Sequence, residues 1–200
     1  MATNRGFARP YWTALRYMLV ATVVLGIAYP VAVLGIGQLA LPAQANGSVV
    51  RVDGEPVGSS LIGQSFTDDE GVALPEWFQS RPSAAGYDGG ASVGSNYGPE
   101  NADFLAEIEE RRAAIAASDG VPADRIPVDA LTTSGSGLDP HISPDYALEQ
   151  VGRVAAARGL DEAAVRELVD SFVQGRDLGY LGEPTVNVLQ LNVALAELGA

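Results

Sequence analysis

The sequence predicts an α+β protein: a single N-terminal transmembrane helix followed by one small mixed domain. Three observations support this: an apolar run of about 25 residues near the start, four later segments with helical spacing, and only short strand-like segments. The length of 200 residues suits one domain plus an appendage. We expect a cytoplasmic N-terminus (1–16), a transmembrane helix (17–41), a linker (42–48) and an exported α+β domain (49–200).

The apolar run, residues 17–41, has no charged side chain. A bilayer core needs about 20 residues of helix, so the run is long enough to span it. Arg5, Arg9 and Arg16 precede the run, and no basic cluster follows it. The positive-inside rule therefore places the N-terminus in the cytoplasm and the main domain outside the cell membrane.

A cleavable signal peptide is the competing interpretation of this segment. Ala43-Gln44-Ala45 has the small-residue pattern of a cleavage site. Signal-peptide cores are usually about 7–15 residues long, so the length of the run favours a retained membrane anchor. Both interpretations export the remainder of the chain.

A stripe of small residues marks one face of the predicted membrane helix. At about 100° per residue, Ala21, Ala28, Ala32 and Gly35 share a face that lets another helix approach closely. We predict them as partner contacts, although alanine and glycine are also common in helices that have no such role. Pro30 is expected to kink the helix.

The composition argues against an independent enzyme. All 12 basic residues are arginine, there is no cysteine, and there is one histidine. Schiff-base lysines, phosphate-loop lysines, thiolate nucleophiles and multi-histidine metal cages are therefore excluded. The net charge of −13 argues against nucleic acid as a partner. We predict no catalytic and no metal-binding residue, and we assign no cofactor site.

The main domain begins with a predicted strand pair and continues mostly with helices. Strands are expected at 48–52 and 57–66, joined by a turn at Asp53-Gly54, and residues 81–99 are expected to be irregular. Strand character near 130–133 is weak. Caps, prolines and apolar spacing predict helices at 99–117, 143–158, 161–172 and 187–198.

Two segments have an alternative chemical interpretation. The glycine-rich stretch 86–98 could cradle a phosphate, but it lacks a lysine and matches neither nucleotide fingerprint, so a structural loop is favoured. Asp139, His141 and Ser143 suggest a hydrolase triad. Such closely spaced residues do not converge on one atom, and Ser143 is a better helix cap.

Seven ordered segments resemble a known family. They are 46–48 (NGS), 58–66 (GSSLIGQSF), 77–84 (WFQSRPSA), 94–99 (GSNYGP), 136–143 (SGLDPHIS), 153–158 (RVAAAR) and 181–189 (LGEPTVNVL). In this order, after one N-terminal span, they resemble the KdpC family, the C subunits of the Kdp potassium-transporting ATPase. The chain departs from the family pattern at Thr185, where arginine is usual, and at Trp77, where tyrosine is usual.

The resemblance implies a non-catalytic accessory subunit of a high-affinity potassium uptake pump. Its implied partners are a potassium-channel-like subunit, a P-type ATPase subunit and the small F subunit, all within membrane lipid. Asn96, Asp139, His141 and Ser143 lie in matching segments and are predicted partner contacts. The family is also described as raising the ATP affinity of the ATPase subunit, and potassium belongs to the whole complex.

The predicted topology conflicts with direct ATP contact, because ATP is cytoplasmic and the main domain is expected outside. Two alternatives stay open. One is a cleaved extracytoplasmic binding protein, based on Ala43-Gln44-Ala45, and the other is an exported hydrolase, based on Asp139, His141 and Ser143.

Overall fold

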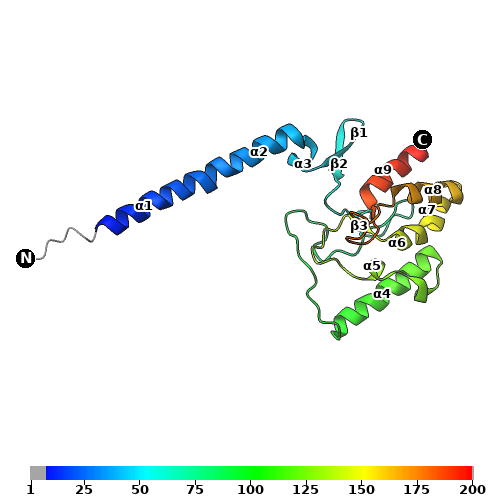
Figure 1. Cartoon of the computed structure of the whole chain (residues 1–200). Helices are drawn as coiled ribbons and strands as arrows, with labels where there is room; N and C mark the ends of the chain where they lie inside the picture. Colours follow the sequence, from blue (N-terminus) through cyan, green and yellow to red (C-terminus); the bar gives the residue numbers. More distant parts are fainter. Residues whose placement is uncertain (1–7, 200) are drawn as a thin grey trace, which may run out of the picture. The chain divides into compact units, whose positions relative to one another are not determined.

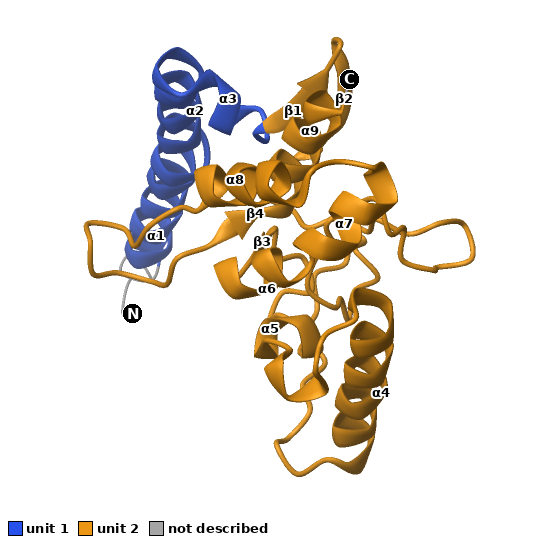
Figure 2. Ribbon diagram, turned by 90° about the vertical axis from the view of Figure 1, so that its right-hand side faces the viewer, with its two compact units in different colours: residues 1–48 blue, residues 49–200 orange. Residues whose placement is uncertain are grey.

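The computed structural model describes residues 8–199 (Figure 1). The chain divides into two compact units, Met1–Ser48 and Val49–Ala200 (Figure 2). The first unit is helical, and the second combines helices with two short antiparallel sheets. This confirms the predicted class, a long apolar helix followed by a small α+β domain.

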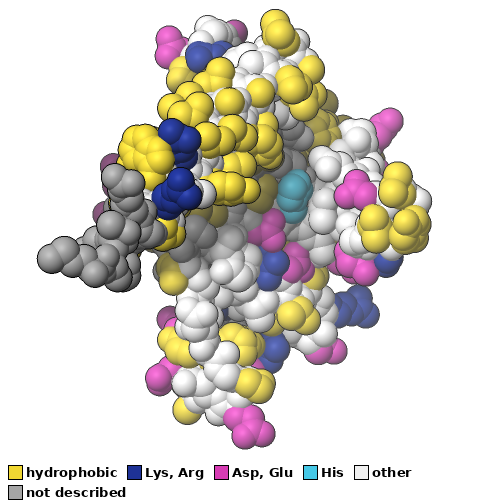
Figure 3. All heavy atoms as spheres, turned by 60° about the vertical axis from the view of Figure 1, so that its left-hand side comes forward, with side chains coloured by type: hydrophobic (Ala, Val, Ile, Leu, Met, Phe, Trp, Pro, Cys, Tyr) yellow, Lys and Arg dark blue, Asp and Glu magenta, His cyan; other side chains and the backbone are white. Residues whose placement is uncertain are grey.

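The first unit is dominated by one continuous helix. α1 (Ala8–Val23), a π-helical turn η1 (Val24–Ala28) and α2 (Tyr29–Ala40) together span Ala8–Ala40, 33 residues. A helix of this length extends about 50 Å, more than the roughly 30 Å of a bilayer core. None of its described side chains is buried, and Figure 3 shows hydrophobic groups gathered along it.

Pro30 lies in the first turn of α2, directly after the π-helical turn. Proline has no N–H and its ring collides with the preceding turn of a regular α-helix. A wider π turn is a known way to absorb such a conflict. The helix therefore continues through Pro30 with a local change of winding.

The helix is followed by a short turn that folds back onto it. α3 (Pro42–Ala45) ends at Asn46, whose amide exchanges two hydrogen bonds with Gln38, at 3.0 and 3.2 Å. Asn46 Nδ2 also donates to the Pro42 carbonyl at 2.6 Å. Side-chain amides thus satisfy polar groups that the helix end leaves open.

The second unit opens with the predicted hairpin. β1 (Val49–Val52) pairs antiparallel with β2 (Glu55–Ser59), and Asp53 and Gly54 have φ of +52° and +85°. Two positive φ values are typical of a tight hairpin turn. The prediction of a strand to residue 66 was too long, because after Ser59 the chain turns and Gly63 N–H bonds to the Leu138 carbonyl at 2.8 Å.

Helices are the main regular elements of the second unit, and irregular segments connect them. The observed elements are α4 (Ala102–Asp119), η2 (Ala123–Arg125), α5 (Val128–Leu131), β3 (His141–Ile142), α6 (Pro144–Glu149), α7 (Val151–Arg158), α8 (Glu162–Phe172), β4 (Val186–Asn187) and α9 (Val188–Leu198). β3 pairs antiparallel with β4. α4 and α9 lie at opposite ends of the unit (Figures 1 and 2).

The helix caps agree with the sequence, with three local differences. Ser143, Asp161 and Asn187 each accept backbone N–H bonds at the start of a helix, as predicted. α4 is capped by Asn101 and begins later than predicted. Residues 128–131 form a helical turn instead of strand, and the helix predicted at 143–158 is interrupted at Gln150.

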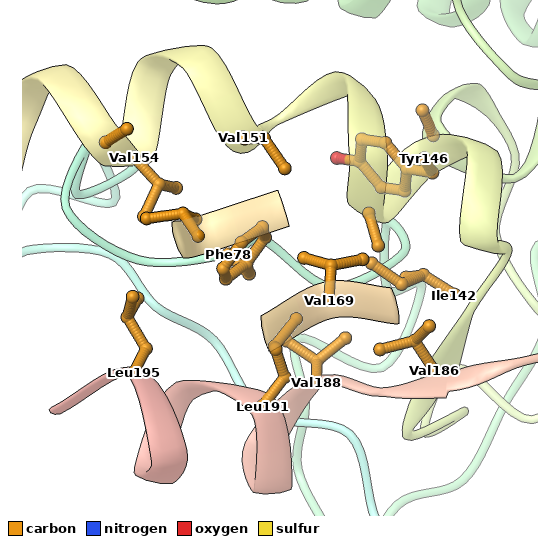
Figure 4. Close-up of a cluster of buried hydrophobic side chains, with 14 of the residues drawn as sticks. Phe78, Ile142, Tyr146, Val151, Val154, Val169, Val186, Val188, Leu191 and Leu195 are labelled. Carbon is orange, nitrogen blue, oxygen red and sulfur yellow. The ribbon is translucent and has the colours of Figure 1, made fainter. Parts of the chain in front are cut away.

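The hydrophobic core is built around Phe78, which is fully buried. Figure 4 shows its ring among apolar side chains of α7, α8 and α9. Phe78 belongs to an irregular segment, so its backbone polar groups have no helix or sheet partner. Asn192 replaces that partner: its Oδ1 accepts from Phe78 N–H and its Nδ2 donates to the Phe78 carbonyl, both at 2.9 Å.

The Gln150 side-chain amide makes the same pair of hydrogen bonds with the backbone of the next residue, Gln79. Its Oε1 accepts from Gln79 N–H at 2.6 Å, and its Nε2 donates to the Gln79 carbonyl at 3.2 Å. Gln150 is fully buried at the break between α6 and α7. Buried backbone groups need such partners, so the two amides allow a strandless segment to run through the core.

Candidate partner-contact site

Three of the predicted contact residues line one open groove of about 440 Å³ in the second unit. They are Asp139, His141 and Ser143, at and beside β3. Residues 183–185, just before β4, and the start of α5 supply other walls. The complete lining is Arg81, Val128, Asp129, Thr132, Asp139, His141, Ile142, Ser143, Glu183, Pro184 and Thr185.

Asp139 is the charged centre of this groove. Its Oδ2 accepts from Arg81 Nη1 at 3.1 Å, and its Oδ1 accepts from the backbone N–H of His141 at 3.0 Å. The imidazole Nδ1 lies 3.7 Å from the same oxygen. Burial by itself raises the pKa of Asp139, but the His141 hydrogen bonds and the Arg81 charge outweigh it, so the pKa is lowered.

Ser143 is occupied by structural hydrogen bonds. Its Oγ donates to Asp129 Oδ1 at 2.9 Å and accepts from Tyr146 N–H at 3.1 Å, capping α6. Its backbone N–H bonds to Asp129 Oδ2 at 2.6 Å. A hydrolase triad needs the histidine to take the proton of the serine hydroxyl, whereas here a carboxylate accepts it. The geometry therefore favours the capping interpretation.

Asn96 lies outside the groove, on the exposed glycine-rich loop. Its Nδ2 donates to the Gly94 carbonyl at 2.9 Å, and its φ is +55°. Residues 92–95 run along 133–137, where a Cβ at Gly94 would lie 2.9 Å from the Gly135 carbonyl oxygen. The glycines thus permit close backbone packing, which explains the loop without a phosphate.

The small-residue face of the membrane helix is altered by the π turn. Ala28, Ala32 and Gly35 follow one another at helical spacing from the end of η1 into α2. Ala21 precedes the π turn, which holds more residues per turn than an α-helix. Ala21 is therefore rotated from the position that a uniform 100° per residue predicts, and the contact role of the four residues stays a prediction.

Comparison with known proteins decides the family. A family profile described as "K+-transporting ATPase, c chain" matches residues 11–197. The chain is 58% identical over 185 residues to a protein of Kineococcus radiotolerans named potassium-transporting ATPase KdpC subunit, covering 92% of this chain and 91% of the relative. The chain belongs to the KdpC family.

Other relatives carry the same name. The KdpC subunit of Caldanaerobacter subterraneus subsp. tengcongensis is 50% identical, with 92% of each chain covered. That of Caulobacter vibrioides is 54% identical over 91% of this chain and 90% of the relative. This chain is therefore similar to KdpC subunits over nearly its whole length.

The segments that resemble KdpC pack against one another. Asn187 Nδ2 donates to the Ser60 carbonyl at 2.8 Å, which joins segments 181–189 and 58–66. Arg153 Nη1 donates to the Trp77 carbonyl at 3.0 Å, and the Arg158 guanidinium lies 4.2 Å from the Trp77 ring centroid. Four of the seven segments are thus joined in pairs within the second unit.

The structure shows the surroundings of both departures from the KdpC pattern, Thr185 and Trp77. Thr185 lines the groove, where an arginine, the residue that the resemblance implies at this position, would add a second positive charge to that of Arg81. Trp77 presents its ring to Arg158, and its larger face suits that cation–π contact.

Sequence analysis missed Arg81 and Asp129, which lie 58 and 14 residues from their partners Asp139 and Ser143.

Glu149 is a further residue that the sequence did not single out in this KdpC-family chain. Both carboxylate oxygens are shielded from solvent without a hydrogen-bond partner in the described part of the chain. Burial raises the pKa of Glu149 to about 7, the Asp119 carboxylate adds to this, Arg153 opposes it, and Asp129 raises it further. The groups face Glu149 from α4, α7 and α5.

Glu149→Gln is expected to remove a pH-dependent loss of stability. The folded-state pKa is above the ordinary value of 4.5, so the stability that Glu149 contributes is present below pH 4.5 and is lost as the pH rises through about 7. After allowance for solvent screening, the variant should gain about 1–2 kcal/mol relative to the parent between pH 4.5 and 8. Urea unfolding of the full chain in detergent at both pH values measures this difference.

Glu110→Gln is the matched control, since Glu110 is exposed on α4. Its difference from the parent should be the same at both pH values. A Glu149→Gln difference that is equally flat would contradict the assignment.

Proposed function

We propose that the chain is a non-catalytic accessory subunit that stabilises the assembled potassium pump. Its partners would be the potassium-channel-like subunit, the P-type ATPase subunit and the small F subunit, which supply the potassium path and the ATP site. The observation that carries the proposal is the 33-residue helix Ala8–Ala40, none of whose described side chains is buried within the chain. Such a helix needs lipid or other helices around it.

We infer that the N-terminus is cytoplasmic and that the second unit lies outside. The support is the placement of Arg9 and Arg16 before the apolar run, with no basic cluster after it. In that topology residues 17–41 cross the membrane, 42–48 connect, and 49–200 form the extracytoplasmic domain.

An effect on ATP affinity would be indirect in this topology. A domain on the outer side changes ATP use only if it binds two conformations of the pump with different affinity. The groove around Asp139, His141 and Ser143, together with Asn96, offers polar groups for such a contact, and the face of Ala28, Ala32 and Gly35 offers a helix contact. ATP and potassium would then be bound by the complex and not by this chain.

Co-purification from native membranes tests the proposal. Cells are grown in limiting potassium with an affinity tag after Ala200, and the chain should retain the sister subunits through detergent extraction. Ala32→Leu, on the small-residue face, should reduce that retention, whereas Val33→Leu on a neighbouring face should not. A chain that never accompanies the other subunits would overturn the proposal, and a protease-protected Ala200 end in intact cells would overturn the topology.

A further inference from the structure

The segment between α8 and β4 forms a hairpin that projects from the second unit (Figure 2). Its base is the pair Gln174 and Thr185, whose N–H and carbonyl groups exchange hydrogen bonds of 2.8 and 3.0 Å. Asp177 and Leu181 exchange two more, both at 2.9 Å. An Arg176–Glu183 ion pair links the two arms. The hairpin is therefore an ordered element with its own hydrogen bonds.

The tip of this hairpin has an unfavourable residue for its backbone. Tyr180 N–H bonds to the Asp177 carbonyl at 3.2 Å, and the two residues between them, Leu178 and Gly179, have φ of +54° and +82°. A turn with two positive φ values prefers Asn-Gly, Asp-Gly or Gly-Gly, and a bulky residue at the first position is strained. Little burial compensates this strain among the described residues, since the Leu178 side chain is 82% exposed.

The rest of the tip is apolar too. Tyr180 is 69% exposed and Leu181 is 49% exposed. Among the described residues of the second unit, no two of the other exposed large apolar side chains lie closer than four positions apart in the sequence. Three such groups within four consecutive residues, on a strained and projecting turn, are typical of a binding element.

We propose that the hairpin tip, Leu178, Tyr180 and Leu181, is an anchor that inserts into an apolar pocket on the extracytoplasmic side of a sister subunit of the pump. This rests on the proposed function. Aromatic and aliphatic anchors in desolvated pockets carry most of the binding energy of an interface. The hairpin base contributes Glu183, Pro184 and Thr185 to the groove around Asp139, so the same hairpin carries the tip and one wall of the candidate contact site.

Charge favours a protein pocket over the lipid surface as the occupant. The second unit contains all 25 acidic residues of the chain and nine of its 12 arginines, a net charge of −16. Anionic lipid headgroups attract basic segments and repel acidic ones. The arms of the hairpin carry Asp177 and Glu183 against Arg176, so they add no positive charge that would draw the tip to a bilayer.

Photo-crosslinking in the assembled pump tests the occupant. Tyr180 is replaced by benzoylphenylalanine, which keeps an aromatic ring, and membranes are irradiated before purification. The expected product is a covalent adduct with a sister subunit, while the same group at Leu61, a 60% exposed loop residue, gives at most a background yield. A lipid adduct alone, or no adduct in a complex that still co-purifies, overturns the anchor but leaves the proposed function standing. Failure to co-purify at all overturns both.

Leu178→Asn separates a binding role from a structural one. Asparagine suits the positive φ, so the hairpin should keep or gain stability while the anchor is lost. We expect the variant chain to dissociate from the immobilised pump about tenfold or more faster, with an unchanged or higher melting temperature. Leu61→Asn is the control and should leave dissociation within about twofold of the parent. An unchanged dissociation rate for Leu178→Asn, or a lower melting temperature that accounts for the loss, overturns the proposal.

Discussion

Arg153→Met is expected to destabilise the second unit by about 3–5 kcal/mol, since it leaves a buried charge unpaired. The side chains of Arg153 and Asp119 are only 8% and 4% exposed, and Arg153 Nε lies 3.0 Å from Asp119 Oδ1. The same guanidinium donates to the carbonyls of Pro75 and Trp77 at 2.7 and 3.0 Å and to Gln150 Oε1 at 2.7 Å. The variant removes all four contacts at once.

The loss should be larger than the pair alone implies. Without Arg153, Asp119 faces the shielded carboxylate of Glu149 with no positive charge between them. Urea unfolding of the full chain in detergent, followed by near-ultraviolet circular dichroism, measures the free energy of unfolding. Arg166→Met is the control, because the Arg166–Glu162 pair is exposed and is expected to contribute about 0.5 kcal/mol or less. Equal effects of the two variants would refute the buried-pair argument.

Phe78→Ala is expected to lower the free energy of unfolding by about 3–5 kcal/mol, because core packing is lost. The Phe78 ring is fully buried at the centre of the cluster in Figure 4, where close-packed neighbours can fill the resulting cavity only in part. The backbone of residue 78 should stay bonded to Asn192, so the expected loss comes from packing. The same urea titration measures it.

Phe104→Ala is the matched control for that prediction. Phe104 is half-buried near the start of α4, and its ring lies 5.8 Å from that of Tyr97. Its truncation should cost about 1 kcal/mol, because less apolar surface returns to water and the neighbouring loop can move in. A Phe78→Ala effect no larger than this would mean that the core is not built around residue 78.

Local signals in the sequence were sufficient for several elements. The uncharged run ahead of Arg51 predicts the long helix, and Asp53-Gly54 predicts the first hairpin. Ser143, Asp161 and Asn187 predict three helix starts, because a cap bonds to N–H groups only two or three residues away. Such signals work without knowledge of the rest of the chain.

Other features depended on distant partners. Phe78 lies next to a stretch that composition marks as irregular, yet it is the centre of the core because Asn192, 114 residues away, satisfies its backbone. The groove joins Asp139 to Arg81 across 58 residues, and Ser143 to Asp129 across 14. The second strand ends at Ser59, and the chain that follows it forms a hydrogen bond with a distant residue, from Gly63 N–H to the Leu138 carbonyl. None of these pairings produces a periodic pattern in the sequence.

The sequence by itself determined the kind of molecule: a charge-free span with arginines before it, and an acidic domain without lysine or cysteine. Only the tertiary structure decided where the polar groups of that domain meet, that Glu149 is shielded from water, and that Leu178 stands on a strained turn. The physical reason is the distance along the sequence over which each interaction acts. Capping, turn preference and hydropathy act over a few residues, whereas burial and the partners of buried groups exist only once the chain has folded.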